Sequence, residues 1–419
     1  MYLRLVSLLG MVSFVGLAWA LSSNRKLFPW RTVLWGIGLQ LSFAVLILKT
    51  SWGAAVFAFV GAAIQQLIRF STEGTKFVFG PLGDNVAMTA VFPGNPLVFA
   101  VLVTGTIIIV SCLSSVLYHW GILQKVVRAI AWVMQRAMGT SGSETLSAAA
   151  NIFMGQTEAP LLIKPYIARM TRSELQCMMV GGMATIAGGV AAVYSKLGAD
   201  AGHPNMAGHL LTASLMNAPA ALLISKVLLP ETEESETRWV APKDPPRTSV
   251  NSIDALCRGA SDGMMLSINV LAMLIGFVAV VALANYLLAL PQTLLGVRHP
   301  ASLQTLFGWV NAPFAWLMGV PARDCLTIGG VLGERIVLNE FIGYVSLTSP
   351  STVVDPRSFA IATYALCGFA NFASIAIQVG GIGSLAPERR AEMAKLGVRA
   401  MVGGLLAAYL SASIAGVLL

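Results

Sequence analysis

A short polar interruption in an otherwise apolar chain most constrains how this protein can fold. The segment Asn151–Tyr166 reads N-I-F-M-G-Q-T-E-A-P-L-L-I-K-P-Y and brings a glycine, three hydrogen-bonding side chains and a proline close together. Irregular backbone in a bilayer is tolerated only where it is buried in protein or lines a wet cavity. A carboxylate such as Glu158 at this depth indicates a functional site. The segment therefore predicts a pocket.

The composition supports a membrane setting. Hydrophobic residues make up 56% of the 419-residue chain and charged residues 11%, with a mean hydropathy of +0.75. Soluble domains carry about 25% charged residues, so this chain has too few charges to cover a water-facing surface. The five cysteines are scattered without metal-ligand spacing, so we expect no disulfide framework and no cysteine metal site.

The distribution of basic residues indicates membrane topology rather than nucleic-acid binding. The net charge is +8, but Lys and Arg gather in short segments around 25–31, 125–136, 164–172 and 389–399. Short basic loops face the cytoplasm under the positive-inside rule. We therefore expect a multi-pass protein in a lipid bilayer, with its N-terminus outside and with no nucleic-acid partner.

Eight apolar stretches approach the length of about 20 residues that spans a bilayer. They are Leu3–Leu21, Val33–Leu48, about Asn95–Tyr118, Leu175–Leu197, Met206–Leu229, Met264–Leu290, Phe359–Ile382 and Ala400–Leu419. Two further segments, Trp52–Phe79 and Gln124–Met138, are apolar on one side only and are typical of interfacial amphipathic helices. The sequence thus predicts an all-α polytopic membrane protein with about eight transmembrane helices.

Two segments are too irregular to be simple spans. Between the polar flanks at 141–144 and 164–172 lie about 25 residues, too few for two crossings at a rise of 1.5 Å per residue. We expect a re-entrant hairpin from the cytoplasmic side there. The segment Leu303–Tyr344 holds prolines and glycines at 313, 319, 321, 329, 330 and 333. We interpret these as breaks and expect a second hairpin, from the outside.

The two hairpins suggest an internal repeat. Each carries a glutamate, Glu158 or Glu340, and each precedes an interrupted span, with the interruptions at 185–189 and 368–371. Because the hairpins enter from opposite sides, the halves form an inverted repeat, the plan of many secondary transporters. We expect N-terminal spans and an interfacial helix in 1–90, the first half in 91–230, a cytoplasmic linker in 231–250 and the second half in 251–419.

The polar groups at these interruptions favour a neutral, hydroxyl-rich ligand. They are the side chains of Gln156, Thr157, Glu158, Glu340, Asn371 and Ser374, which together offer both donors and acceptors. No Arg or Lys lies within 155–158 or 368–374, which argues against a phosphate or dicarboxylate ligand. Alternatively, Glu158 pairs with Lys164 on its own hairpin, and Asn371 and Ser374 join helices.

Three motifs resemble the concentrative nucleoside transporter family, and most closely its bacterial sodium/nucleoside symporters. They are Gly155–Leu162 (G-Q-T-E-A-P-L-L), Leu338–Phe341 (L-N-E-F) and Ala365–Ile375 (A-L-C-G-F-A-N-F-A-S-I). The resemblance implies a homotrimer in the bacterial inner membrane in which each protomer has its own pathway. It also implies import of a nucleoside, such as uridine, by symport with sodium.

The same resemblance implies roles for twelve residues. Gln156 and Thr157 would contact the base, with Glu158 nearby and Val190 as an apolar wall. The ribose hydroxyls would meet Glu340, Asn371 and Ser374, with Phe369 packing beside them. Sodium would be bound by the side chains of Asn151 and Thr185 and by the main-chain carbonyls of Met154 and Ile186.

The expected mechanism is alternating access, in which the hairpins and interrupted spans move against the third and sixth spans. A proton-coupled symporter is the alternative, because Glu158 or Glu340 could carry the proton. A nonselective channel would need a continuous polar face, whereas the polar residues here cluster at the interruptions. An enzyme would have the pair Glu158 and Glu340 as its only acid–base candidates, so we expect no enzymatic activity.

Overall fold

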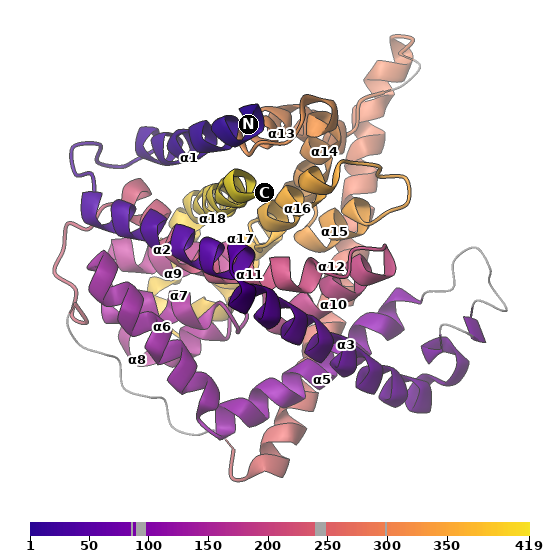
Figure 1. Ribbon diagram of the computed structural model, residues 1–419, viewed down its shortest axis with the longest axis horizontal. Coiled ribbons are helices and arrows are strands. Elements are labelled where there is room, and N and C mark those ends of the chain that lie inside the picture. Colours follow the sequence, from indigo (N-terminus) through magenta and orange to yellow (C-terminus); the bar gives the residue numbers. More distant parts are fainter. Residues whose placement is uncertain (85–86, 89–97, 239–248, 298–299) are drawn as a thin grey trace.

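The described part of the chain is entirely helical. The computed structural model describes residues 1–84, 87–88, 98–238, 249–297 and 300–419, and these residues contain no β-strand (Figure 1). Three helices come first: α1 (Tyr2–Ala20), α2 (Trp30–Lys49) and α3 (Ser51–Phe79), the last followed by the short 3₁₀ turn η1 (Gly80–Gly83). An all-α architecture is therefore confirmed.

The remaining helices form two series with the same order of elements. The first series is α5 (Phe99–His119), α6 (Ile122–Met138), α7 (Gly142–Ala150), η2 (Ala159–Ile163), α8 (Lys164–Ile167), α9 (Arg172–Ala184), α10 (Gly188–Asp200) and α11 (Met206–Leu228). The second is α12 (Ser252–Leu294), α13 (Leu303–Leu317), η3 (Ala322–Asp324), α14 (Cys325–Val337), α15 (Glu340–Leu347), α16 (Pro356–Leu366), α17 (Phe372–Gly381), the turns η4 (Ile382–Ser384) and η5 (Pro387–Arg389), and α18 (Arg390–Leu418). Each series thus contains a hairpin of short elements, a broken pair and a long closing helix.

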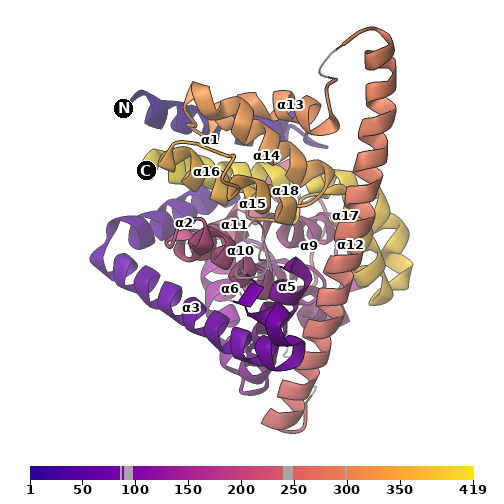
Figure 2. The same cartoon turned by 90° about the vertical axis from the view of Figure 1, so that its right-hand side faces the viewer.

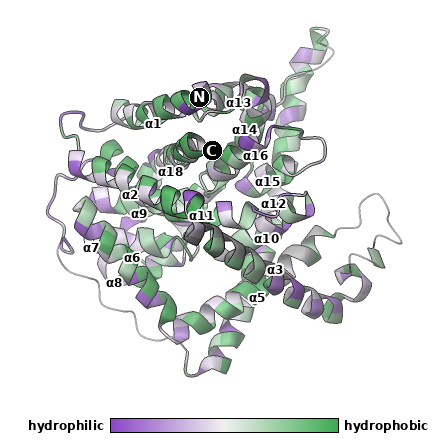
Figure 3. Ribbon diagram, viewed as in Figure 1, coloured by the Kyte–Doolittle hydropathy of each residue, from purple (hydrophilic) through white to green (hydrophobic). Residues whose placement is uncertain are grey.

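Several of these helices have the length and composition of membrane spans. Within the described residues, five spans pass this test, namely α1, α2, the α9–α10 pair, α11 and the segment containing α18, and the bent α5–α6 pair makes a sixth. The other two predicted spans correspond to α12 and to the broken pair α16–α17. Figure 3 shows apolar colouring along much of α1, α2 and α11. The first residues of the predicted third span, 95–97, lie outside the described part of the chain.

Helix α6 leaves the direction of α5 at a sharp corner. The two helices differ in direction by 78°, and Gly121 between them has φ of 74°, a left-handed conformation that glycine adopts without steric cost. Helix α6 buries one face, through Val127, Ala131 and Met134, as predicted for an amphipathic segment.

The structure corrects the prediction for the second hairpin. We interpreted Pro313, Gly329, Gly330 and Gly333 as helix breaks, but Pro313 lies inside α13 and the three glycines lie inside α14. A Cβ at Gly329 would lie 2.5 Å from the Gly308 carbonyl oxygen, and one at Gly333 would lie 2.9 Å from the Phe307 Cβ. Gly329 and Gly333 therefore let α13 and α14 pack closely, as small residues do between membrane helices, whereas a Cβ at Gly330 would have no atom within 4 Å. The hairpin itself is α14–α15, with its break at 338–339.

The two broken pairs meet at their breaks. The Phe369 N–H donates to the Thr185 carbonyl over 3.3 Å, and a Cβ at Gly368 would lie 2.7 Å from the Ala184 carbonyl oxygen. From α11, the Asn217 Nδ2 donates to the carbonyls of Ala184 and Cys367, at 2.7 and 2.6 Å. The Asn217 amide thereby provides hydrogen bonds to carbonyl groups at the ends of two helices, which have no partner within their own helices.

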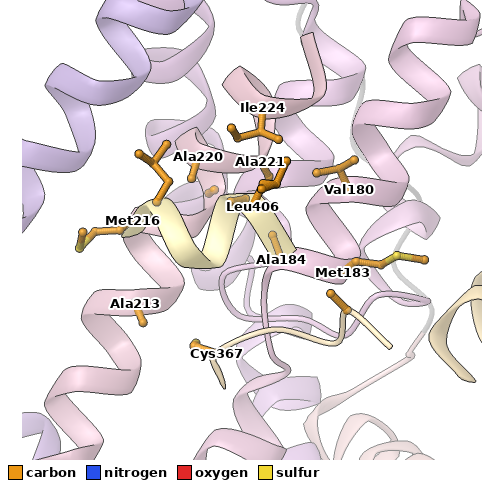
Figure 4. Packing of buried hydrophobic residues seen from close by; sticks show 14 of the residues in the cluster. Val180, Met183, Ala184, Ala213, Met216, Ala220, Ala221, Ile224, Cys367 and Leu406 are labelled. Atoms are coloured by element: carbon orange, nitrogen blue, oxygen red, sulfur yellow. The ribbon is translucent and has the colours of Figure 1, made fainter. Parts of the chain in front are cut away.

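Helix α11 forms the centre of the hydrophobic core. Figure 4 shows its residues Ala213, Met216, Ala220, Ala221 and Ile224 packed near α9 and α18. All five side chains are completely buried. This packing holds the broken pair α9–α10 against α11.

A buried charged cluster ties the first hairpin to α11 and to the start of the linker. Lys226 Nζ lies 2.8 Å from Glu144 Oε2 and 3.1 Å from Glu231 Oε2, and the Glu144 side chain is only 1% exposed. The Gly142 N–H and the Ser143 N–H both donate to Thr237, to its carbonyl and its hydroxyl. The first part of the predicted linker, 231–238, is therefore fixed to the hairpin; residues 239–248 lie outside the described residues, and the description resumes at 249.

Helix α12 stands along one side of the molecule as its longest element (Figure 2). Its 43 residues extend over about 65 Å at 1.5 Å per residue. It packs against α5 through small residues: a Cβ at Gly259 would lie 2.6 Å from the Cys112 Cα, and one at Gly263 would lie 2.8 Å from the Ile108 Cα. These two helices are the predicted third and sixth spans.

Candidate functional site

The predicted ligand residues surround one cavity of about 430 Å³. It is lined by the tip of the first hairpin, by α10, by the start of α15, by the α16–α17 break with the start of α17, and by α5 and α12. The eight predicted substrate residues all lie on its wall: Gln156, Thr157, Glu158, Val190, Glu340, Phe369, Asn371 and Ser374. A cavity of this size is typical of a small-molecule site.

The charge of the cavity wall is limited to two carboxylates. Its described lining residues include Glu158 and Glu340 but no Arg or Lys. Glu158 is exposed toward the cavity, and its Oε2 accepts a hydrogen bond from the Gly155 N–H at 3.2 Å. The ion pairs of the described residues do not include the alternative pair of Glu158 with Lys164.

Glu340 is held in place by two hydrogen-bond donors. The Tyr194 hydroxyl donates to Oε1 at 2.9 Å, and Asn371 Nδ2 donates to Oε2 at 3.1 Å. Asn371 Oδ1 in turn accepts from the Ser374 N–H at 2.9 Å, which caps α17 and fixes the orientation of the amide. Because a carboxylate offers about four acceptor positions, Glu340 can still accept hydrogen bonds from a ligand in the cavity that it lines.

Helix α15 begins with a second cap of the same type. Asn339 Oδ1 accepts from the Ile342 N–H at 3.0 Å, which satisfies one of the free N–H groups of the first turn. The cap places Glu340 at the first helical position, where the positive end of the helix dipole stabilises a carboxylate. The L-N-E-F motif thus positions Glu340 through local structure.

Gln156 connects the first hairpin to α17. Its Nε2 donates to Ser374 Oγ at 3.3 Å, and its Oε1 accepts from Gln378 Nε2 at 3.0 Å. Gln156 is 7% exposed and Gln378 is fully buried. The group predicted to meet a base is therefore joined directly to a group predicted to meet a ribose.

The predicted sodium ligands come from two neighbouring segments. The Gly188 N–H donates to the Phe153 carbonyl at 3.2 Å, which ties the hairpin tip to the α9–α10 break. Asn151 Nδ2 donates to the Ser147 carbonyl, while its Oδ1 is buried without a partner. The Thr185 hydroxyl donates to the Gly181 carbonyl at 2.9 Å and keeps its lone pairs. No hydrogen bond among the described residues reaches the carbonyls of Met154 or Ile186.

These oxygens have the chemistry that a small hard cation needs. Amide, hydroxyl and carbonyl oxygens are the ligands that hard cations prefer. A buried oxygen without a hydrogen-bond partner, such as Asn151 Oδ1, costs free energy unless a cation or a water binds to it. Among the described residues, no group of three or more His, Cys, Asp and Glu side chains could hold a metal ion. The four residues thus fit a sodium ion.

Sequence reasoning missed two residues of the site. Tyr194 is fully buried on α10, lines the cavity and stacks on Tyr344 with ring centroids 4.2 Å apart. It lies four residues after Val190, and Gln378 lies four residues after Ser374, so each is on the helix face of a predicted residue. This four-residue spacing is the sequence pattern that could have identified Tyr194 and Gln378 as residues of the site.

Comparison with known proteins places these features in a family. Residues 9–82 and 209–416 match the N- and C-terminal models of "Na+ dependent nucleoside transporter", and residues 100–201 match the model "Nucleoside recognition". An uncharacterized transporter of Haemophilus influenzae is 41% identical over 98% of this chain and 97% of its own length. Sodium/nucleoside cotransporter 2 of Rattus norvegicus is 37% identical over 99% of this chain and 63% of its own length.

Solved structures agree with the sequence relatives. The structure of CNTnw in an inward-facing substrate-bound state superimposes with a TM-score of 0.90, at 38% identity, covering 99% of this chain and 97% of that one. Variants of CNTnw are known in outward-facing and intermediate states. These relatives are transporters, which confirms that the chain is not an enzyme.

Proposed function

Because this chain belongs to the concentrative, Na⁺-dependent nucleoside transporter family, we propose that it imports nucleosides by symport with sodium. The observation that carries this proposal is the Glu340 carboxylate, which Tyr194 and Asn371 hold in place on the wall of a cavity whose described lining residues include no Arg or Lys. A ribose supplies two adjacent hydroxyl donors and no charge. The wall thus matches a nucleoside better than a nucleotide, whose phosphate would need a cation.

The base would lie at the first hairpin. Gln156 and Thr157 offer amide and hydroxyl groups, with Glu158 beside them, and Val190 and Phe369 provide apolar surface for a ring. Asn371 and Ser374 would share the ribose with Glu340. In this arrangement the two ends of the ligand are bound by the two halves of the chain.

Sodium would bind at Asn151, Met154, Thr185 and Ile186, a few residues from the base contacts. An ion that orders the tip between Asn151 and Gly155 also orders Gln156 and Thr157. The nucleoside then binds more tightly in the presence of sodium, and by linkage sodium binds more tightly in the presence of nucleoside. This reciprocity couples the two fluxes.

Transport would proceed by alternating access across the bacterial inner membrane, in a homotrimer whose protomers each have a pathway. The hairpins and broken pairs would move against α5 and α12. The small-residue contacts between α5 and α12 make these two helices a tight pair, which suits a static frame. Ile107 of α5 and Asn269 of α12 line the cavity, so this frame would contribute one wall of the pathway.

Uptake of radiolabelled uridine into proteoliposomes tests the proposal, with sodium and proton gradients imposed separately. We expect uphill accumulation of intact uridine that follows the sodium gradient at constant pH. Accumulation that follows pH and ignores sodium would favour the proton-coupled alternative, with Glu158 or Glu340 as the carrier. Equilibration without accumulation would indicate a channel.

A further inference from the structure

The orientation of the Gln156 amide is set by a chain of hydrogen bonds that ends on the backbone. Gln378 Nε2 donates to the Met179 carbonyl at 3.1 Å and to Gln156 Oε1 at 3.0 Å. A backbone carbonyl can only accept, so Gln378 must turn its nitrogen toward α9. Both hydrogens of that nitrogen are then in use.

The orientation of the Gln378 amide determines the orientation of the Gln156 amide. If Gln156 flipped, its nitrogen would face the Gln378 nitrogen, and two buried donors would be left unpaired. Buried unpaired donors are strongly disfavoured. The side chains of Gln156 and Gln378 are also tightly packed against α9: a Cβ at Gly182 would lie 2.6 Å from Gln378 Nε2 and 2.9 Å from the Gln156 Cβ. The oxygen of Gln156 therefore faces Gln378, and its nitrogen faces Ser374 on the cavity wall.

We propose that Gln378 is a specificity-determining residue: by fixing Gln156 with its N–H₂ toward the cavity, it selects nucleosides whose base presents an oxo group rather than an amino group there. The inference rests on the proposed contact between Gln156 and the base. One hydrogen of the Gln156 nitrogen goes to Ser374 Oγ, and the second is free to donate to a base oxygen. An amino group at that position would place donor against donor.

Two matched pairs of nucleosides test this contact. Uridine and cytidine differ by an oxo or amino group at one ring position and by the proton on the adjacent ring nitrogen, and so do inosine and adenosine. We expect kcat/KM for sodium-driven uptake to favour the oxo member of each pair by about tenfold or more, the factor that one unpaired buried donor produces. Equal rates, or preference for the amino members, would overturn the inference.

Substitutions at Gln378 give the second test. Gln378→Met removes both hydrogen bonds and frees Gln156 to rotate, so each oxo/amino ratio should fall toward one. Gln378→Glu replaces the donating nitrogen by an oxygen; as a carboxylate this group can only accept, so Gln156 should turn its nitrogen toward residue 378 and the ratio should invert. The matched control is Gln176→Met, which changes another fully buried glutamine that does not line the cavity; its ratios should equal those of the unaltered protein.

The ratio compares two substrates on the same protein, so it does not depend on the amount of folded variant. Unchanged ratios in both Gln378 variants would contradict the role of Gln378. If both variants fail to assemble, the nucleoside panel on the unaltered protein tests the orientation of the Gln156 amide, and equal rates within each pair would still overturn the inference. Absence of uptake of every nucleoside by the unaltered protein would instead contradict the proposed function, and this inference with it.

Discussion

Replacing Glu340 by glutamine isolates the charge of the ribose site from its shape. Glutamine keeps the size of the side chain and one acceptor oxygen. Asn371 cannot flip, because its Oδ1 caps α17, so the new amide must turn its oxygen toward Asn371 Nδ2 and its nitrogen toward the Tyr194 hydroxyl. A hydroxyl can accept as well as donate, so both internal contacts survive and the fold should be retained.

The loss should appear in the ligand contacts instead. Hydrogen bonds to a charged group contribute about 1.5–3 kcal/mol and neutral ones about 0.5–1.5 kcal/mol, so each ribose hydroxyl should lose about 1–1.5 kcal/mol. Two hydroxyls give about 2–3 kcal/mol, which corresponds to a fall in kcat/KM for uridine of about 30- to 150-fold.

The assay is sodium-driven uptake into proteoliposomes with uridine and with 2′,3′-dideoxyuridine, which lacks both hydroxyls. Glu340→Gln should lower uptake of uridine by the stated factor and leave the dideoxy analogue nearly unaffected. Size-exclusion profile and thermal unfolding should match those of the unaltered protein. Unchanged uridine uptake, or an equal loss for both substrates, would refute the assignment of Glu340 to the ribose.

Three further predictions follow from single contacts. Tyr194→Phe removes the donor to Glu340 Oε1 and should raise KM for uridine about tenfold, while stacking on Tyr344 preserves the fold. An unchanged KM in uptake assays would show that the Tyr194 hydrogen bond does not position Glu340 for the ligand. Thr185→Val should raise the half-saturating sodium concentration for uptake about tenfold or more, whereas Thr185→Ser should keep the value of the unaltered protein. The same half-saturating concentration in both variants would show that Thr185 is not a sodium ligand. Lys226→Met leaves Glu144 buried without a counter-ion and should lower the free energy of unfolding in detergent by about 3–5 kcal/mol. Adding Glu144→Gln to the same chain should recover part of this loss. If the losses of stability from the two substitutions simply add, Lys226 and Glu144 are not paired.

The sequence allowed the helical breaks to be predicted because their causes are local. The runs around Thr185 and Gly368 carry glycines and hydrogen-bonding side chains where a continuous apolar helix was otherwise expected. The structure has breaks at 185–187 and 367–371. The all-α membrane fold was likewise predicted from apolar length, which is a local property. The roles of the lining residues toward ligand and ion remain predictions.

The errors came from contacts between distant segments. Gly329 and Gly333 of α14 have the composition of a break, but their partner is α13, and only the packing of the two helices shows that they are contact positions. Tyr194 and Gln378 are 146 and 222 residues from the groups that they bond, so no local pattern connects them. Lys226 likewise resembles a basic residue near a helix end until Glu144 and Glu231 are seen beside it.

We further expect one sodium ion to move with each nucleoside, and the dependence of accumulation on membrane potential measures this coupling. Proteoliposomes with equal sodium and equal pH on both sides are held at a series of potassium diffusion potentials, and the steady-state ratio of internal to external uridine is recorded. One positive charge per nucleoside gives about 2.3 kcal/mol, or roughly fiftyfold accumulation, at 100 mV inside negative, and choline in place of sodium should abolish it. A ratio that stays near one at every potential, or that persists in choline, would contradict the account.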